Sequence, residues 1–566
     1  IEGELAVDTR CTAGELRIEQ AARVVAEGDE PVIVLRVRGT SPRGGRLVVA
    51  IRPYNPEGVQ FIDSVAARPG RDGWLVNNRL EVQIDRPADA ILTSDYASGD
   101  VFSWLTGAAS ELEPPDARHA RSQPGEMRCG TGMATAASIY EFAGPTSELT
   151  IRVPIGKELQ TLGNPEAFRC HATVGWSDAL EGTARLQIPD ERMQFLYDAA
   201  VRTITLLSAD EIVPGPYTYR RFWFRDACLM MNSLLAVGLV DRCRRAFAKF
   251  PARQLRNGYF RSQEGEWDSN GQVLWALDRY VHVSGEQASP ALLDAAEKAV
   301  AWIARKRLPS GSGAPHAGLL PPGFSAEHLG PNDYYYWDDY WSQGGLQAAE
   351  RLFQRAGRQA AAARAAAEAE RLSRDIERSI ASIPRRRSLG GIPASPYRRL
   401  DSGAVGSLVA DYPLQLCEPG EARIMATVEG LLGMSFHHNA FFQEIIHSGI
   451  NAYLTLDIAQ TLLRAGDPRY RELVDAVADA SSPTGQWPEA IHPLSGGGCM
   501  GDGQHGWAAA EWVMMIRHLF VREEADRLIV GSGLYKEWLV DEEISFGPTP
   551  TPWGPVSVRV TPVDTG

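Results

Sequence analysis

The chain has 566 residues and a mass of 61.9 kDa, which predicts two to four domains. Hydrophobic residues make up 44% and charged residues 23% of the sequence, as in globular proteins, so a wholly disordered, collagen-like or low-complexity chain is excluded. The formal net charge of -14 repels a phosphate backbone, and we therefore expect no nucleic-acid partner.

Cysteine usage and hydropathy point to a protein of a reducing compartment. The seven cysteines are scattered and show no CxxC spacing, which argues against a disulfide framework or a zinc knuckle. No stretch approaches the roughly 18 to 20 apolar residues of a membrane span, and the first 30 residues carry no basic head before an apolar run. We expect a cytoplasmic protein without a membrane partner; a signal segment removed earlier stays an open alternative.

Residues 1–190 alternate Val- and Ile-rich runs with turn residues. Period-two runs bounded by Gly, Pro, Asn and Asp are typical of antiparallel strands, and no helical period separates them. We predict an N-terminal antiparallel β-sandwich that acts as a structural platform. The clearest runs lie at 31–39, 45–58, 74–84 and 147–156.

From residue 191 the hydrophobic period becomes helical and continues to about 540. Paired helices separated by loops rich in Gly, Pro, Trp and acidic residues predict an all-α toroid of helical hairpins, with a cleft among the loops at one end. The tail, 541–566, is Pro-rich and β-like, and could return to the β-domain or form an edge strand. The helical segments are 191–209, 224–239, 270–285, 292–308, 359–383, 421–433, 441–466, 471–481 and 505–521.

Two clusters place an aromatic residue before an Asp at the head of a helix. In YRRFWFRDACLMM, Trp223 precedes Arg225 and Asp226, and in GYFRSQEGEWDSNGQ, Trp267 precedes Asp268. Each Asp could be a mere N-terminal cap. The repetition favours a second interpretation, in which these residues contact a ligand.

The segment PNDYYYWDDYWSQGGL surrounds carboxyl groups with aromatic rings. Asp338 and Asp339 lie among Tyr336, Trp337 and Trp341. Aromatic rings stack on apolar sugar faces while charged groups bind hydroxyls, so this pattern indicates a sugar site. Burial and like charge would raise the pKa of an acid here; alternatively, one Asp caps the helix and the other is solvated.

The segment TGQWPEAIHPLSGGGCMGDGQHGW combines ligand-binding residue types with glycines. Trp487, Glu489 and His492 precede the Gly-rich turn, and Gln504 and His505 follow it. Glycines let the backbone approach a ligand, but no GK[ST] follows, so this is no phosphate-binding P-loop.

Two other interpretations are rejected. Glu444 and His447 would form an i, i+3 pair on a helix, but HExxH is absent and we predict no metal site. DDYWS resembles a truncated acidic motif of terpene synthases, but no second metal motif accompanies it.

The segment RFWFRDACL resembles the Trp-x-x-Arg-Asp segment of the glucoamylase-type glycoside hydrolases, and YYYWDDYW resembles their Trp-Glu-Glu segment with Asp in place of Glu. The resemblance covers about 190 to 540 and implies an (α/α)6 barrel that cleaves glycosidic bonds with inversion. By position, Asp338 matches the general acid, and Asp339 matches its substrate-contacting neighbour. Arg225 and Asp226 match the pair that holds hydroxyls of the terminal sugar, which favours exo attack.

Glu489 is our candidate for the general base, with Glu444 in reserve, and the choice between Asp338 and Asp339 as the acid stays open. Inversion needs an acid and a base about 6.5 to 9.5 Å apart and requires no metal or organic cofactor. The expected partner is an oligosaccharide or glycoside, α-glucoside-like, with Trp267, Trp337, Trp341 and Trp487 as stacking platforms. A phosphorylase and an inactive carbohydrate-binding protein stay open as alternatives.

Overall fold

The computed structural model describes residues 6–27, 30–55, 58–59, 61–106, 126–155, 175–325, 330–445, 448–539 and 542–562. Contacts divide the chain into two compact units, Ile1–Glu181 and Gly182–Gly566. Within the described residues, no helix has both the length and the apolar composition to span a bilayer. The six cysteines in these ranges are free, and Cys170 lies outside them.

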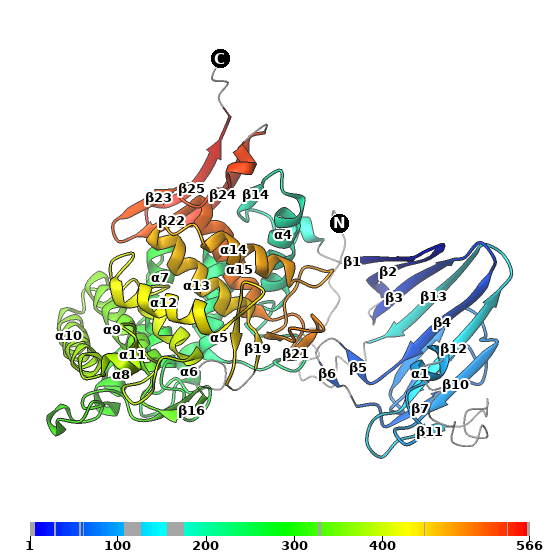
Figure 1. The fold of residues 1–566 in the computed structure, drawn as a ribbon, viewed down its shortest axis with the longest axis horizontal. Helices are drawn as coiled ribbons and strands as arrows, with labels where there is room; N and C mark the ends of the chain where they lie inside the picture. Colours follow the sequence, from blue (N-terminus) through cyan, green and yellow to red (C-terminus); the bar gives the residue numbers. More distant parts are fainter. Residues whose placement is uncertain are drawn as a thin grey trace. The chain divides into compact units, whose positions relative to one another are not determined.

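The first unit contains two main antiparallel sheets, drawn in blue and cyan in Figure 1, and the short two-stranded pair β5-β6. The strand order is β1-β2-β3-β13-β9-β8-β7-β11 in the larger sheet and β10-β12-β4 in the smaller. The predicted run 74–84 is a hairpin, because Asn77 and Asn78 adopt positive φ between β8 and β9. The elements are β1 Ala6–Ala13, β2 Leu16–Glu27, β3 Glu30–Thr40, β4 Gly45–Ile51, β5 Tyr54–Asn55, β6 Gly58–Val59, β7 Ser64–Ala67, β8 Gly73–Val76, β9 Leu80–Ile84, β10 Ala90–Ser94, α1 Val101–Thr106, β11 Glu126–Arg128, β12 Thr135–Phe142 and β13 Thr146–Pro154.

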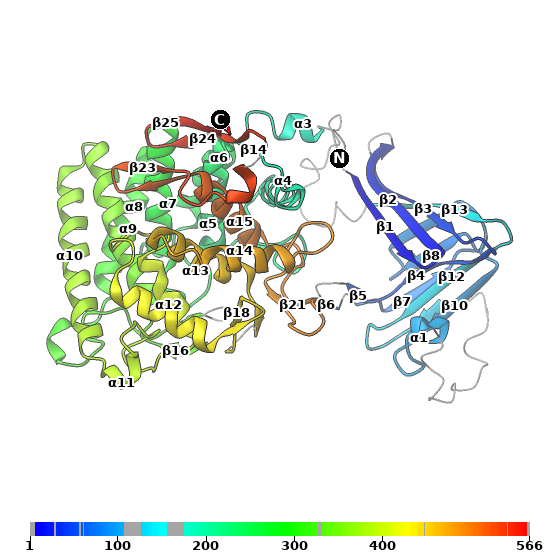
Figure 2. The same ribbon diagram turned by 45° about the horizontal axis from the view of Figure 1, so that its top comes forward.

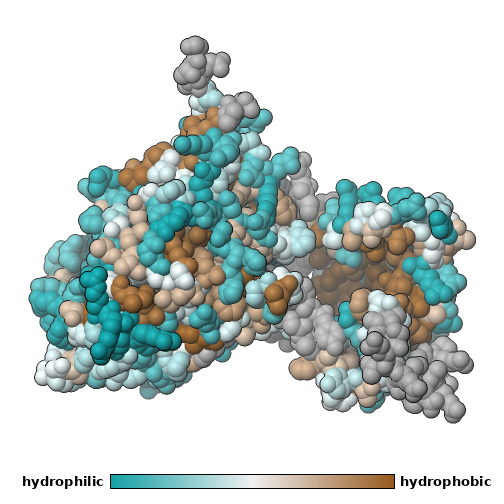
Figure 3. Space-filling view, in the orientation of Figure 1, coloured by the Kyte–Doolittle hydropathy of each residue, from teal (hydrophilic) through white to brown (hydrophobic). Residues whose placement is uncertain are grey.

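One hydrophobic core joins the two sheets. Val65 and Trp74 of the larger sheet belong to the same buried cluster as Ile91 and Tyr140 of the smaller one. The antiparallel sheets that the sequence predicted are therefore present and share a core. Apolar residues also gather on one face of this unit (Figure 3), and the exposed ones of β1 and β2 are Val7, Leu16, Ile18 and Val24.

The second unit is built mainly of helices (Figures 1 and 2). Its helices are α3 Trp176–Ala179, α4 Glu191–Leu206, α5 Phe224–Ala236, α6 Val240–Arg253, α7 Ser269–Ser284, α8 Pro290–Lys306, η1 Ser310–Ser312, α9 Tyr336–Arg355, α10 Gln359–Ala381, α11 Arg385–Ser388, η2 Ser402–Ala410, α12 Ala422–Met434, α13 Ala452–Ala465, α14 Tyr470–Asp479, α15 Gly506–Phe520 and η3 Lys536–Leu539. Its strands are β14 Arg185–Gln187, β15 Gly323–Ser325, β16 Gly330–Asp333, β17 Phe436–His437, β18 Ala440–Gln443, β19 Gly449–Ile450, β20 Ala490–Ile491, β21 Gly498–Met500, β22 Val521–Glu524, β23 Arg527–Val530, β24 Ile544–Thr551 and β25 Gly554–Val560.

Contacts between neighbours lead from α5 to α7, α9, η2, α13 and α15 and return to α5. We call these six elements the ring helices. Most of their residues are buried, and α5 and α15 are buried along nearly their whole length. The remaining long helices contact them from outside, α6 and α8 on α5 and α7, α10 on α9, α12 on η2, α14 on α13, and α4 on α15.

The helix predicted over 441–466 is wrong in its first half. Ala440–Gln443 forms β18, which pairs with β17 and β19, and the helix α13 begins only at Ala452. The positive φ of His438 and Asn439 closes the tight β17–β18 turn and explains the strand pairing. Glu444 is exposed and not helical, and His447 lies outside the described residues.

The tail belongs to the helical unit. β24 pairs with both β14 and β25, so the described part of the tail returns to this unit and not to the β-rich one, which the sequence left open. Thr549 fixes β24: its hydroxyl accepts a bond from Arg517 Nε (2.9 Å) and donates to the carbonyl of Ala236 (2.6 Å).

We predict that Thr549→Val destabilises the helical unit by about 1 to 3 kcal/mol, because it leaves a buried guanidinium nitrogen and a buried carbonyl without a partner. Urea unfolding followed by tryptophan fluorescence measures the change. Thr561→Val, which removes an exposed hydroxyl bonded to Glu543, is the matched control and should change little. Equal effects of the two substitutions would contradict the anchoring role of Thr549.

Candidate active site

A cavity of about 310 Å³ opens at the N-terminal ends of α5 and α15. Three carboxyl side chains and several aromatic rings form its wall. The carboxyl groups come from the first turn of α5, from the loop before α7 and from the loop before α15. The described lining residues are Pro214, Tyr219, Trp223, Asp226, Gln263, Glu266, Phe324, Glu489, His505 and Trp507.

Asp226 lies in the first turn of α5, where the helix dipole favours a carboxylate. Its Oδ1 is 4.0 Å from Nε2 of His505, the residue before α15. Trp223 precedes α5 and carries the guanidinium of Arg221 on its ring, 3.7 Å from the centroid. The structure thus brings two segments about 280 residues apart in sequence to one side of the cavity.

Glu489 is buried in the cavity wall and accepts a hydrogen bond from the Tyr219 hydroxyl. The loop that carries Tyr219 is held by Asp502. Its fully buried carboxylate accepts bonds from the backbone N–H groups of Tyr217 (3.1 Å), Thr218 (2.6 Å) and Tyr219 (3.0 Å). Asp502 therefore fixes the position of the phenol that contacts Glu489.

Asp268 joins three ring helices at this end. Its Oδ2 accepts bonds from Arg225 Nε of α5 (2.7 Å), Trp337 Nε1 of α9 (2.7 Å) and Gln272 Nε2 of α7 (3.2 Å). Asp268 stands at the N-cap position of α7, but its side chain makes no capping bond. The carboxylate is therefore used for tertiary structure, and it lies behind the cavity wall.

Asp338 is also buried, in the first turn of α9. Burial raises its pKa well above the usual range, and the charges of Asp268 and Asp339 add to this effect. A Cβ on Gly323 would lie 2.6 Å from its Oδ2, so the backbone of β15 packs directly on the carboxyl group. Burial thus favours the neutral form of Asp338, and Gly323 packs against it beside the cavity residue Phe324.

Asp339 faces a different environment. Its Oδ1 accepts the backbone N–H of Leu320 at 2.9 Å, and burial raises its pKa to about 7. The neighbouring acids Asp338 and Asp339 are therefore distinct: Asp338 lies among the charged groups near the cavity, and Asp339 anchors the segment that leads to β15.

Several residues expected at a sugar site do not line the cavity. Trp267 packs with Tyr259 and Trp302, Trp341 with Trp275, and Trp487 with Trp512, because each indole fills space between elements. The Tyr336 hydroxyl bonds to Ser379, Gln504 bonds to Thr203, and His492 is exposed and lines another hollow. Arg225 and Trp337 hold Asp268 from behind.

Four further residues of the site were not predicted from the sequence: Glu266, Tyr219, Trp507 and Asp502. Glu266 lines the cavity, and its Oε1 is 3.7 Å from a guanidinium nitrogen of Arg225. Its signal was available: it precedes Trp267-Asp268 in the same acidic-aromatic segment. Tyr219 and Asp502 had no pattern to mark them, since they meet only in the folded chain.

The fold is shared with a solved bacterial glucoamylase complexed with acarbose, at a TM-score of 0.60 and 13% identity, over 91% of this chain and 83% of that one. Other similar structures are a rhamnose-bound rhamnosidase from Klebsiella oxytoca (TM-score 0.48, 13% identity, 84% and 97% covered) and a GH78 family rhamnosidase of Bacillus sp. GL1 (0.48, 13%, 89% and 48%). No protein-family model and no curated protein sequence matches the chain. The glucoamylase likeness confirms, for the fold, the resemblance found in the sequence.

We predict that Asp339→Asn flattens the pH dependence of stability. A carboxyl group with a raised pKa stabilises the folded state fully at low pH, and this contribution is lost as pH rises from about 4 toward 7. The free energy of unfolding of the variant should increase, relative to that of the parent, by up to about 1.4 kcal/mol for each pH unit across that window. Urea titrations at pH 4.5, 6 and 7.5 measure this, and parallel curves for both proteins would contradict it.

We also predict that Asp502→Asn loosens the Tyr217–Tyr219 loop, because the neutral amide is a weaker acceptor for three N–H groups. Hydrogen exchange of these amides should accelerate by about 5- to 100-fold. Asp526→Asn, at an exposed turn, is the control. Unchanged exchange in the Asp502 variant would rule out the clamp.

Proposed function

We propose that the protein is a glycoside hydrolase that holds a terminal sugar in the 310 Å³ cavity and releases it with inversion. The observation that carries this proposal is the cavity wall itself. It combines Asp226, Glu266 and Glu489 with the rings of Trp223 and Trp507, which is the chemistry of a sugar site.

The arrangement of the ring helices supports the proposal. Their closed order of contacts, each backed by an outer helix, fits an (α/α)6 barrel, and the glucoamylase that shares this fold is complexed with acarbose. In this interpretation the cavity lies at the barrel end where the ring helices begin. Its volume is at the small end of the range of about 300 to 1,000 Å³ typical of ligand sites, which favours a terminal sugar over an internal stretch of polymer.

We assign the general base to Glu489. It lines the cavity, and the hydroxyl of Tyr219 donates to one of its oxygens, so the carboxylate is held at the wall, where it can orient a water molecule. Asp226 and Glu266, from other elements of the wall, bind sugar hydroxyls in this assignment.

We assign the general acid to Asp338, because burial raises its pKa and so favours the protonated form that a general acid needs. For this role, the Gly323–Phe324 segment must move aside when substrate binds, since Gly323 packs on the carboxyl group. Glu266 is the competing acid because it already lines the cavity, and the variants below distinguish the two.

The wall favours water over phosphate as the second reactant. Among the described residues that line the cavity there is no Arg or Lys, whereas three carboxyl groups face it. A phosphate dianion would meet this negative charge without an Arg or Lys partner in the lining, so a phosphorylase fits less well than a hydrolase.

The direct test is a proton NMR time course with α- and β-linked gluco- and manno-oligosaccharides, with and without phosphate. We expect a free monosaccharide whose first anomer is opposite to that of the cleaved bond. Retention of the anomer would exclude the inverting mechanism, turnover only with phosphate would establish a phosphorylase, and binding without turnover would establish an inactive carbohydrate-binding protein.

Variants then test the roles. Glu489→Gln and Asp338→Asn should each lower kcat by about 10² to 10⁴ while sugar binding persists. Only loss of the acid is compensated by a glycosyl fluoride, whose leaving group needs no proton. If the glycosyl fluoride restores the activity of Glu266→Gln and not that of Asp338→Asn, the general acid is Glu266. Glu444→Gln, at an exposed position, is the control and should keep full activity.

A further inference from the structure

A second cavity, of about 380 Å³, lies toward the opposite ends of the ring helices. Helix α7 has Asp268 at its N-cap and contributes Arg279 to this cavity, and α15 has Trp507 in the first cavity and His518 in the second. Eleven residues of helix span about 16 Å, so the two cavities are separate sites. Other lining residues are Asn232 of α5, Arg351 of α9, Arg464 of α13 and, from the loops and strands, Gln415, Arg522, Glu523 and Trp553.

The lining carries more positive than negative side chains. The lining includes two acids, Asp278 and Glu523, and four arginines, Arg279, Arg351, Arg464 and Arg522. Both acids are already paired. Asp278 accepts bonds from Arg351 Nε (2.9 Å) and from Arg355, and Glu523 accepts two bonds from Arg517 (2.7 and 2.6 Å).

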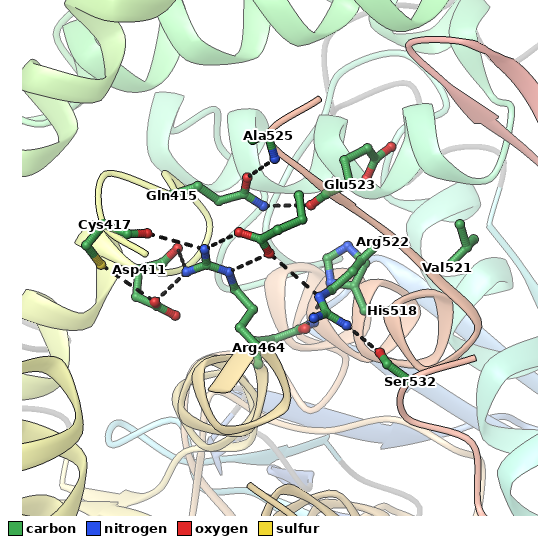
Figure 4. A network of polar contacts seen from close by, with 12 residues as sticks. Asp411, Gln415, Cys417, Arg464, His518, Val521, Arg522, Glu523, Ala525 and Ser532 are labelled. Carbon is green, nitrogen blue, oxygen red and sulfur yellow. Dashed lines mark hydrogen bonds and ion pairs between the residues drawn. The ribbon is translucent and has the colours of Figure 1, made fainter. Parts of the chain in front are cut away.

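The arginines that border the cavity from α13 and β22 also have partners. Figure 4 shows the guanidinium of Arg464 bonded to Asp411, and its other nitrogens reach the carboxylate of Glu524. Arg522 bonds to the hydroxyl of Ser532, and Gln415 bonds to the backbone of Glu523 and Ala525. Arg464 and Arg522 are therefore each already bonded to a protein partner.

Arg279 differs from these arginines. No hydrogen bond or ion pair joins its guanidinium to any residue of the described ranges, and its Nε is buried. Burial lowers its pKa, but an arginine keeps its charge in proteins. The side chain as a whole is only partly buried, and the charges of Glu523 and Asp278 act on it without a hydrogen bond. An anion in the adjoining cavity would supply a directly bonded partner.

Asn232 provides a second, independent sign of a ligand. It is only 5% exposed, it lines the cavity, and its Oδ1 has no hydrogen-bond partner among the described residues. An amide oxygen accepts from a hydroxyl group. Trp275 and the half-exposed Trp553 add aromatic surface to the same cavity, which suits a ring or a carbon chain.

We propose that this cavity binds a small hydroxylated oxyanion, a sugar phosphate or a sugar acid. Its anionic group pairs with Arg279, and a hydroxyl group donates to Asn232. This ligand site is separate from the carboxyl-lined cavity and does not depend on the function proposed for it.

The test is calorimetric titration and thermal denaturation of the full chain with glucose 6-phosphate, gluconate, inorganic phosphate and glucose, against chloride at equal ionic strength. Glucose 6-phosphate and gluconate both combine an anionic group with hydroxyl groups. The one that binds more tightly shows whether the site takes a sugar phosphate or a sugar acid. We expect glucose 6-phosphate or gluconate to bind and to raise Tm, and glucose to have no effect at this site.

Arg279→Gln should weaken that binding at least tenfold, because it removes the charge that pairs with the anionic group. Arg245→Gln, at an exposed position, removes the same charge and should leave binding unchanged. The Glu489→Gln variant should also bind normally, which separates this site from the other cavity. Equal binding by the parent and the Arg279 variant would overturn the proposal.

A measurement on the parent protein covers the case in which the Arg279 variant fails to fold. Phenylglyoxal modification of arginines, mapped by peptide mass spectrometry, should be slowed at Arg279 by glucose 6-phosphate or gluconate and not by glucose. If neither anion binds more tightly than chloride, or if Arg279 is modified equally with and without them, the cavity is not an oxyanion site.

Discussion

The carboxylate of Asp268 is the contact on which the site depends most. It is buried, and it receives bonds from Arg225 and Trp337 as well as from its own helix, so it ties α5, α7 and α9 together at one end. A buried ion pair contributes little net stability, but removal of one partner costs about 3 to 5 kcal/mol because the other charge is left without compensation. The same contact bears on Asp338. Arg225 is bonded to Asp268, and the pKa of Asp338 is raised by burial and by the charges of its acidic neighbours.

Much of the fold could be predicted from hydrophobic periodicity. The change from period two to a helical period near residue 190 falls close to the boundary between Glu181 and Gly182, and the long helices from α4 to α15 were mostly visible as amphipathic or apolar runs. The strands before Ala452 could not be predicted in this way, because the periodicity of a short apolar run does not distinguish a strand from a helix. The pairing of β24 with β14 joins segments more than 350 residues apart, and no local pattern encodes such a contact.

The site was predictable where its residues begin helices and less so elsewhere. Aromatic residues followed by an acid singled out Trp223, Asp226 and Glu489, which the structure brings to one cavity. The same composition also singled out Trp341 and Trp487, which are completely or almost completely buried, because an indole that packs between helices looks the same in sequence as one that stacks on a sugar. Glu266 stands in the same acidic-aromatic segment as Trp267 and Asp268, but only the folded loop shows that it, and not its two neighbours, lines the cavity.

The common direction of the ring helices explains why acidic and basic groups are segregated. Their first turns carry Asp226, Asp338 and Asp339, and their last turns carry Arg355 and Arg464, as expected from partial positive charge at helix N-termini and partial negative charge at C-termini. That field alone would lower the pKa of each acid, by an interaction of about 0.3 to 2 kcal/mol. For Asp338 the direction is reversed, so desolvation and the charge of Asp268 must outweigh the helix dipole. At the end of the ring helices where the dipoles attract carboxylates, burial thus favours the protonated form of one of them.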